Sequence, residues 1–258
     1  MLKIEKTVLP SPEQWEIIIE GMRNPMNSWD KMDSHFCEQD SCGCPECDKW
    51  TPYDENWVNC DHDYIIGEND HKLMMQLAKG GAVHGKYRRM IPVFLTITAP
   101  FYWWKEFDTY KVGTVANSCS TMHKIQAKEF TMDDFSHEHL MDEGYVLDGE
   151  NCFLSPMDCL REQVVVLNMV RNKYFEAKNK PMKEEAKRSE NMKRWWWQMI
   201  QLLPTSYNQK RTVMLNYEVL VNIYHSRKNH KLDEWHVFCD WIKTLPYSEL
   251  ITGGDDDV

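Results

Sequence analysis

The chain has 258 residues, of which 42% are hydrophobic and 27% are charged, and its formal net charge at pH 7 is −10. This length suffices for one large domain with a substantial core, and the composition is that of an ordinary globular protein. The negative charge argues against direct, sequence-independent binding of nucleic acid, which needs a basic surface, but it allows a small pocket that holds a nucleotide with one or two cations.

The first residues lack the apolar run of a signal peptide, and no segment approaches the roughly 20 apolar residues of a membrane helix. We therefore expect a single domain over residues 1–258, located in the cytoplasm and without a membrane partner. Eleven tryptophans should lie mostly in the core or in contacts between subunits, because indole rings bury large apolar areas.

The first elements are marked by strand and capping signals. Residues 2–9 predict a short strand, and a helix comes next, with Ser11 at its N-cap and Gln14 as the capping-box partner. Residues 27–69 are polar and turn-rich and hold five of the nine cysteines, which predicts an insert lobe. A helix is predicted over 68–79, and a strand within 89–98.

The second half predicts mainly helices. Apolar residues recur at helical spacing over 158–177. Residues 178–194 are highly charged and are expected to form a mobile loop or an exposed helix whose charges are solvated. Further helices are predicted over 211–227 and 231–244, and residues 252–258 should be a disordered acidic tail.

The cysteine-rich lobe contains candidate metal ligands. Thiolates and imidazoles at short spacing are the donors that tetrahedral zinc prefers. In a reducing compartment this density of cysteines favours a structural zinc over disulfides, with free cysteines and redox chemistry as the alternatives. The candidate ligands are Cys37, Cys42, Cys44, Cys47, Cys60 and His62.

A strand that ends in Ala99-Pro100, an aromatic helix and a polar turn together resemble the flavin-dependent thymidylate synthases (ThyX). That family carries the signature R-H-R-x-x-S-x-N-x-x-S-x-R after its aromatic helix. Asn117 and Ser120 keep the N-x-x-S spacing, whereas Thr109-Tyr110-Lys111 stands in place of the Arg-His-Arg triplet. The final arginine of the signature falls on Met122 or on His123.

A second segment resembles the same family. Leu203-Pro204 precedes Asn216 and then, on one expected helix, Leu220, Asn222 and Arg227, all at the family's spacings. Two departures remove positive charge, since family arginines correspond here to Glu218 and Ile200. His230 lies one residue from the family's histidine.

The resemblance implies an α+β fold in which helices flank an antiparallel sheet, here with the Cys-rich insert. It implies a homotetramer that binds flavin (FAD) between subunits, with a dUMP-like pyrimidine nucleotide beside it and with folate and NAD(P)H as further reactants. The implied catalytic residues are Ser120 and Arg227. The implied nucleotide-binding residues are Asn117, Ser120, Lys111, His123 and Arg227, and the implied cofactor-binding residues are Asn216, Asn222 and His230.

The missing arginines leave two classes of function open. Each charge-assisted contact to a phosphate contributes about 1.5–3 kcal/mol. Lys105, Lys111, Lys124 and His123 compensate in part, but a lysine gives a point charge and lacks the planar fork of arginine. One class is a flavin-dependent enzyme that modifies a pyrimidine nucleotide. The other is a catalytically lapsed protein that binds or sequesters a nucleotide, by analogy with phage-encoded sponges of nucleotide signals that act against host defence in the host cytoplasm.

Overall fold

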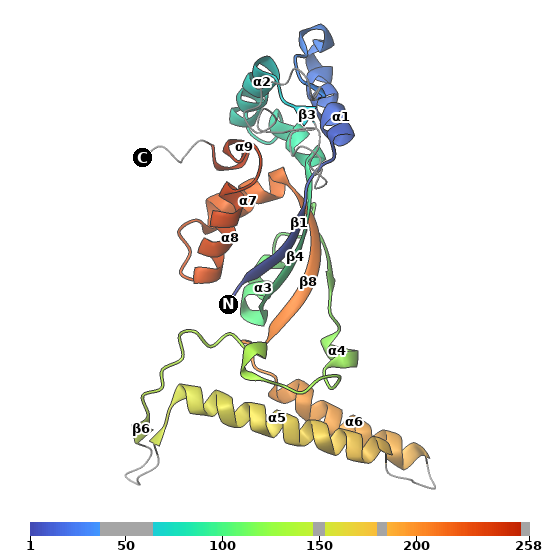
Figure 1. The fold of residues 1–258 in the computed structure, drawn as a ribbon, viewed down its shortest axis with the longest axis vertical. Coiled ribbons are helices and arrows are strands. Elements are labelled where there is room, and N and C mark those ends of the chain that lie inside the picture. The colour runs from blue at the N-terminus through green and yellow to red at the C-terminus, as the bar shows by residue number, and fades with distance from the viewer. Residues whose placement is uncertain (37–63, 147–152, 180–184, 254–258) are drawn as a thin grey trace, which may run out of the picture. The chain divides into compact units, whose positions relative to one another are not determined.

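The computed structural model describes residues 1–36, 64–146, 153–179 and 185–253 (Figure 1). Its central feature is a four-stranded antiparallel sheet in the order β1-β4-β8-β5. The strands are β1 Lys3–Val8, β4 Pro92–Pro100, β8 Asn208–Asn216 and β5 Val115–Ser118. The sheet and the surrounding helices confirm the predicted α+β class.

The chain divides into two compact units, and each strand of the sheet contributes residues to both. One unit, here called the hairpin unit, comprises Met1–Glu5, Thr96–Thr109 and Ala116–Thr212; the other, the C-terminal unit, comprises Lys6–Leu95, Tyr110–Val115 and Val213–Val258. The other elements of the hairpin unit are α3 Phe101–Phe107, α4 Thr121–Lys124, η5 Met132–Asp134, β6 Tyr145–Val146, β7 Phe153–Leu154, α5 Pro156–Asn179 and α6 Glu185–Leu202. Those of the C-terminal unit are α1 Pro12–Arg23, η1 Asn24–Met26, η2 Trp29–Lys31, β2 His35–Phe36, β3 Tyr64–Ile65, α2 Glu68–Lys79, η4 Gly85–Met90, α7 Tyr217–Arg227, α8 Asp233–Lys243 and α9 Glu249–Thr252.

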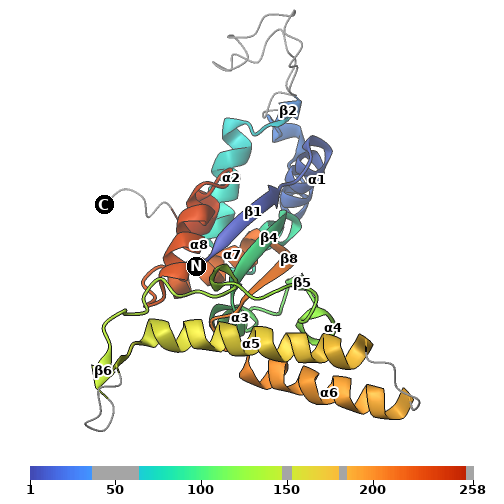
Figure 2. The ribbon, with the colours of Figure 1, turned by 60° about the horizontal axis from the view of Figure 1, so that its bottom comes forward.

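The hairpin unit is built on α5 and α6, which run side by side (Figures 1 and 2). Its core is a cluster of buried side chains against which Trp195 and Trp196 pack, whereas Trp197 is 42% exposed. The buried members are Ile125, Phe130, Phe135, Leu160, Leu167, Val170 and Met199. The charged residues from Glu185 onward belong to α6, so of the two alternatives predicted for 178–194 the exposed helix is correct there.

The C-terminal unit has a separate core in which α7 packs against α8 and α9. Leu220 and Ile223 of α7 and Trp235 and Phe238 of α8 are fully buried. Thr252, predicted to begin a disordered tail, is also fully buried as the last residue of α9. The tail beyond Gly253 lies outside the described residues.

Most sequence-predicted elements are confirmed, and besides the start of the tail one boundary is wrong. The capping box of α1 forms as expected, with Gln14 N donating to Ser11 Oγ at 3.3 Å. The helix predicted over 211–227 begins only at Tyr217, because 211–216 belong to β8. Val213 and Leu215 are fully buried and alternate with more exposed neighbours, which is the period of a strand.

A buried carboxylate anchors the first part of the predicted insert. Asp70 of α2 is fully buried and accepts hydrogen bonds from Arg23 Nε at 2.5 Å, Ser34 N at 2.9 Å and Asp33 N at 3.0 Å. Nearby, β2 and β3 pair antiparallel, with Phe36 opposite Tyr64. Residues 36 and 64 therefore lie side by side, with the candidate zinc ligands between them in sequence.

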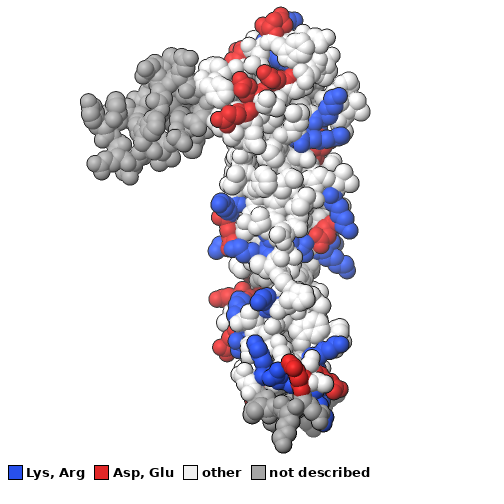
Figure 3. Space-filling model, turned by 90° about the vertical axis from the view of Figure 1, so that its right-hand side faces the viewer, with Lys and Arg blue, Asp and Glu red and all other residues white. Residues whose placement is uncertain are grey.

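Surface charge is mixed in sign on the face drawn in Figure 3. Lys and Arg side chains are interspersed there with Asp and Glu, so that face carries no single sign of charge. Within the described ranges, no helix combines the length and the apolarity needed to cross a bilayer.

Candidate functional site

Arg227, in the last turn of α7, is held by two aromatic side chains of the same unit. Its Nε donates a hydrogen bond to the Tyr110 hydroxyl at 2.9 Å. Its Cζ lies 4.8 Å from the centroid of the Trp235 ring and 5.6 Å from that of Tyr110. Trp235 is itself fully buried. The guanidinium therefore has a defined orientation, and guanidinium groups bind phosphate, carboxylate and carbonyl oxygens well.

Asn216, a predicted cofactor-binding residue, is the N-cap of α7. Its side-chain oxygen accepts from Val219 N at 3.1 Å, so the carboxamide already satisfies one free N–H of the helix. The segment before β5 packs closely here: a Cβ on Gly113, whose φ is +81°, would lie 3.1 Å from Asn216 Nδ2. Asn222 is exposed, and at 100° per residue it projects from a different face of α7 than Arg227.

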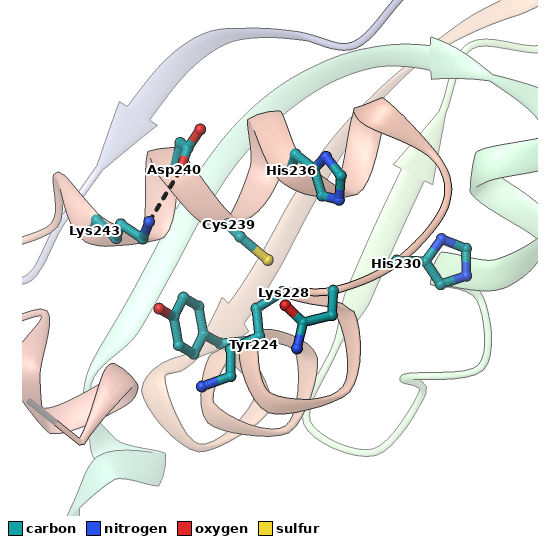
Figure 4. A pocket seen from close by; sticks show the side chains of 8 residues that line it. Tyr224, Lys228, His230, His236, Cys239, Asp240 and Lys243 are labelled. Atoms are coloured by element: carbon teal, nitrogen blue, oxygen red, sulfur yellow. Dashed lines mark hydrogen bonds and ion pairs between the residues drawn. The ribbon is translucent and has the colours of Figure 1, made fainter. Parts of the chain in front are cut away.

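His230 lies in the connection between α7 and α8. Leu232 N donates to its Nδ1 at 3.2 Å, so the neutral imidazole carries its hydrogen on Nε2. A hollow of about 570 Å³ opens beside it between the two helices (Figure 4). The hollow is lined by Tyr224, Lys228, Asn229, His230, His236, Cys239, Asp240 and Lys243.

Glu218, at a position where the family has arginine, forms an ion pair inside the C-terminal unit. Its Oε2 lies 2.8 Å from Arg88 Nη2, and the two side chains are 12% and 7% exposed. Arg88 Nη1 also donates to Leu250 O at 3.1 Å. The ion pair joins η4 to α7, and the hydrogen bond to Leu250 joins η4 to α9.

The predicted nucleotide-binding residues of the hairpin unit are exposed. Asn117 lies in β5, and Ser120 is the N-cap of α4, where its hydroxyl accepts from His123 N at 3.1 Å. The side chains of Asn117, Ser120 and His123 are open to solvent.

Three lysines near the motif turn offer further positive charge. Lys105 and Lys124 belong to the hairpin unit and Lys111 to the C-terminal unit, and all three are exposed. Within the residues that the structure describes, none of the three forms an ion pair. Their ammonium groups are therefore available to a ligand.

Arg211, a cation of β8 that the sequence motifs did not mark, is held by three side chains of the hairpin unit. Its Cζ lies 4.2 Å from the centroid of Trp104, its Nε donates to Gln209 Oε1 at 2.9 Å and its Nη1 to Asp108 Oδ1 at 2.7 Å. Gln209 Nε2 in turn donates to Cys119 O at 2.9 Å. This network fixes β8 against α3 and against the residues after β5, which is a structural role.

The six candidate zinc ligands of the Cys-rich lobe lie in residues 37–63, outside the described residues, so the zinc site stays a prediction. In the remaining sequence, over the described ranges, no group of three or more His, Cys, Asp or Glu side chains is arranged to hold a metal ion.

These features define an α+β protein with the fold of the flavin-dependent thymidylate synthases, as the sequence motifs predicted. A thymidylate synthase X from Helicobacter pylori, solved with FAD and dUMP, shares the fold with a TM-score of 0.55 and 13% identity, over 98% of this chain and 97% of that one. A flavin-dependent thymidylate synthase ThyX from the same organism, complexed with FAD and dUMP, gives 0.53 and 12%, over 98% of both chains. The UMP/dUMP methylase PolB from Streptomyces cacaoi, bound to 5-Br dUMP, gives 0.51 and 11%, over 98% and 94%.

The likeness lies in structure and hardly in sequence. No family model matches the chain, and no curated protein matches it. At 11–13% identity the solved structures establish the fold, and the ligands named above are those of the other proteins.

Proposed function

We propose that this protein binds a dUMP-like pyrimidine nucleotide and acts on it as a flavin-dependent enzyme of the thymidylate synthase type. The observation that carries the proposal is Arg227, a guanidinium oriented by Tyr110 and Trp235 at the position that the motif spacing selects. The fold neighbours that hold FAD and dUMP support the ligand class.

The donors of this chain fit such ligands. A pyrimidine and a phosphate require a cation, which Arg227 of the C-terminal unit offers, and amide or hydroxyl groups, which Asn117 and Ser120 of the hairpin unit offer. Each unit also presents an exposed lysine, Lys105 or Lys111, of the kind that binds a phosphate. When bound, FAD would carry reducing electrons from NAD(P)H, with folate as the source of the one-carbon unit. The chain's own task would be to bind and orient: Arg227 would hold a phosphate or a pyrimidine oxygen.

The alternative, a lapsed protein that binds or sequesters a nucleotide without turnover, is favoured by Glu218. This carboxylate is committed to Arg88, so a positive charge of the family is replaced by a structural ion pair. A homotetramer, a phage origin and a cytoplasmic location belong to either version of the proposal.

The first experiment identifies what the purified protein carries. We expect a flavin absorbance spectrum and, after heat release, a pyrimidine nucleotide in the mass spectrum. NADPH oxidation that requires both added dUMP and methylenetetrahydrofolate would support the enzyme. A bound nucleotide without flavin and without turnover would support the binding protein, and the absence of any nucleotide affinity would refute both.

The second experiment tests Arg227 by calorimetry with dUMP. Arg227→Ala should weaken binding by about 2–5 kcal/mol, the range for truncating one partner of a buried charged contact, which is roughly 30-fold to several thousand-fold in Kd. Arg227→Lys should recover only part of the affinity. The matched control is Arg161→Ala, since Arg161 is 52% exposed and its ion pairs among the described residues are with the surface carboxylates of Asp142 and Asp158. Equal affinity of Arg227→Ala and wild type would refute the assignment.

Arg211→Ala would be an unsuitable control, although no ligand motif marks that residue. Its contacts with Trp104, Gln209 and Asp108 make the replacement a perturbation of the hairpin unit.

A further inference from the structure

The hollow between α7 and α8 concentrates cationic and hydrogen-bonding groups in a chain whose net charge is −10. Lys228 enters it from the C-terminal end of α7, and Lys243 lies at the last turn of α8 (Figure 4). Among the described residues, Asp240 is the one carboxylate in its lining. Its volume of about 570 Å³ is that of a small-molecule site.

The two lysines are arranged so that a ligand can reach them. Lys228 Nζ lies 5.6 Å from the centroid of the Tyr224 ring, which positions the ammonium above an aromatic face. Lys243 Nζ lies 3.2 Å from Asp240 Oδ1, with side-chain exposures of 43% and 72%. An ion pair this exposed contributes little, and an ammonium has three donors, so Lys243 can bind an anion as well.

The remaining lining supplies donors and adds no negative charge. Asn229 contributes a carboxamide, and His230 contributes an Nε2–H when neutral because its Nδ1 accepts from Leu232 N. Burial, with the nearby Asp240 carboxylate, raises the pKa of the Cys239 thiol to about 11, so it stays uncharged at neutral pH. His236 lines the same hollow; its Nδ1 lies 4.0 Å from the Asp233 carboxylate.

We propose that the α7–α8 hollow is a binding site for a phosphate group, bound by Lys228 and Lys243 with His230 and Asn229 as hydrogen-bond donors. The phosphate comes either from free inorganic phosphate or from the phosphate of a small molecule such as a nucleotide. The proposal does not depend on the flavin or on the role of Arg227.

The test is a titration of the full-length protein at pH 7.5, monitored through the imidazole proton signals of His230 and His236 in NMR spectra. Inorganic phosphate and dUMP are titrated separately, which distinguishes the two sources. We expect a saturable shift of these signals with at least one of the two probes. Lys228→Gln and Lys243→Gln should each weaken the binding of that probe about fivefold or more, since each removes a charged donor.

Another replacement should change the affinity for the probe in the opposite direction. Asp240→Asn removes the carboxylate that competes for Lys243 and should strengthen binding about threefold. The control is Lys79→Gln, which removes an exposed lysine from the last turn of α2 and should change nothing. A change in folding would move all variants alike, so opposite effects of the lysine and aspartate replacements identify an anion site.

The outcomes separate this proposal from the function proposed above. Arg227→Ala should leave phosphate binding in the hollow intact even where it abolishes dUMP binding elsewhere. The proposal is overturned when neither probe saturates, or when Lys228→Gln and Lys243→Gln bind the probe as tightly as the wild type and the control Lys79→Gln do.

Discussion

The ion pair between Arg88 and Glu218 predicts a large loss of stability when only one partner is replaced. The charges are 2.8 Å apart, on side chains that are 7% and 12% exposed. Glu218→Gln keeps the shape but leaves the buried guanidinium without its counter-charge. Arg88 Nε is already buried without a hydrogen bond, so the carbonyl of Leu250 would be the principal acceptor left to this guanidinium. Breaking one side of such a pair costs about 3–5 kcal/mol.

Urea unfolding monitored by circular dichroism measures this loss. The control is Glu20→Gln, which neutralises an exposed carboxylate of α1 and should change the free energy of unfolding by less than about 0.5 kcal/mol. The double replacement Arg88→Met with Glu218→Leu should cost less than either single replacement, because an apolar pair leaves no buried charge. Glu218→Arg, which restores the family's residue, should destabilise the protein by placing two guanidinium groups together.

Two results would refute this reasoning. One is a Glu218→Gln protein as stable as Glu20→Gln. The other is a double variant whose loss equals the sum of the two single losses, since that additivity would show that the two charges do not interact.

Four other features of the chain carry predictions of their own. Tyr110→Phe removes the hydroxyl that accepts from Arg227 and should weaken dUMP binding about tenfold by calorimetry, with an unchanged melting temperature as the sign that orientation and not folding is affected. Burial alone would raise the pKa of Asp70, but the hydrogen bonds from Ser34 and Arg23 hold that pKa below its ordinary value. The Asp70 carboxylate therefore stabilises the fold above about pH 4, and this stability is lost as pH falls through the lowered pKa. The urea midpoint of the wild type should show this loss, and that of Asp70→Asn should not. Elemental analysis of protein made without a metal-affinity tag should find about one zinc per chain, and no zinc with nine freely titrating thiols would contradict the Cys-rich site. Light scattering should show a homotetramer at micromolar concentration, whereas a monomer would contradict pockets built between subunits.

Local signals in the sequence predicted local structure well. The capping box of Ser11 and Gln14, the helix over 68–79 and the helix in 158–177 depend on neighbours within a few residues, so their spacing suffices to place them. The helix predicted over 211–227 wrongly included residues 211–216, which belong to β8. The strand there is decided by pairing within the sheet, which a window of local sequence does not contain.

The candidate site was predictable in part for the same reason. Motif spacing selected Arg227, but the partners that orient it, Tyr110 and Trp235, come from different stretches of the chain. Tyr110 lies 117 residues away, and it occupies the place of the family's missing triplet, where the sequence indicated only a loss of charge. Likewise the partner of Glu218 is Arg88, from a segment 130 positions earlier, and only the folded chain brings the two charges together.

The pairing of β2 with β3 has an evolutionary consequence. Because Phe36 lies opposite Tyr64, with their ring centroids 5.1 Å apart, the described residues on either side of 37–63 adjoin each other. The Asp70 carboxylate holds the residues just before Phe36 in place, because it accepts hydrogen bonds from the backbone N–H groups of Asp33 and Ser34. A stretch joined in this way can be lengthened, shortened or exchanged between relatives without redirecting the chain on either side. Selection can therefore change its chemistry separately from that of the candidate site around Arg227.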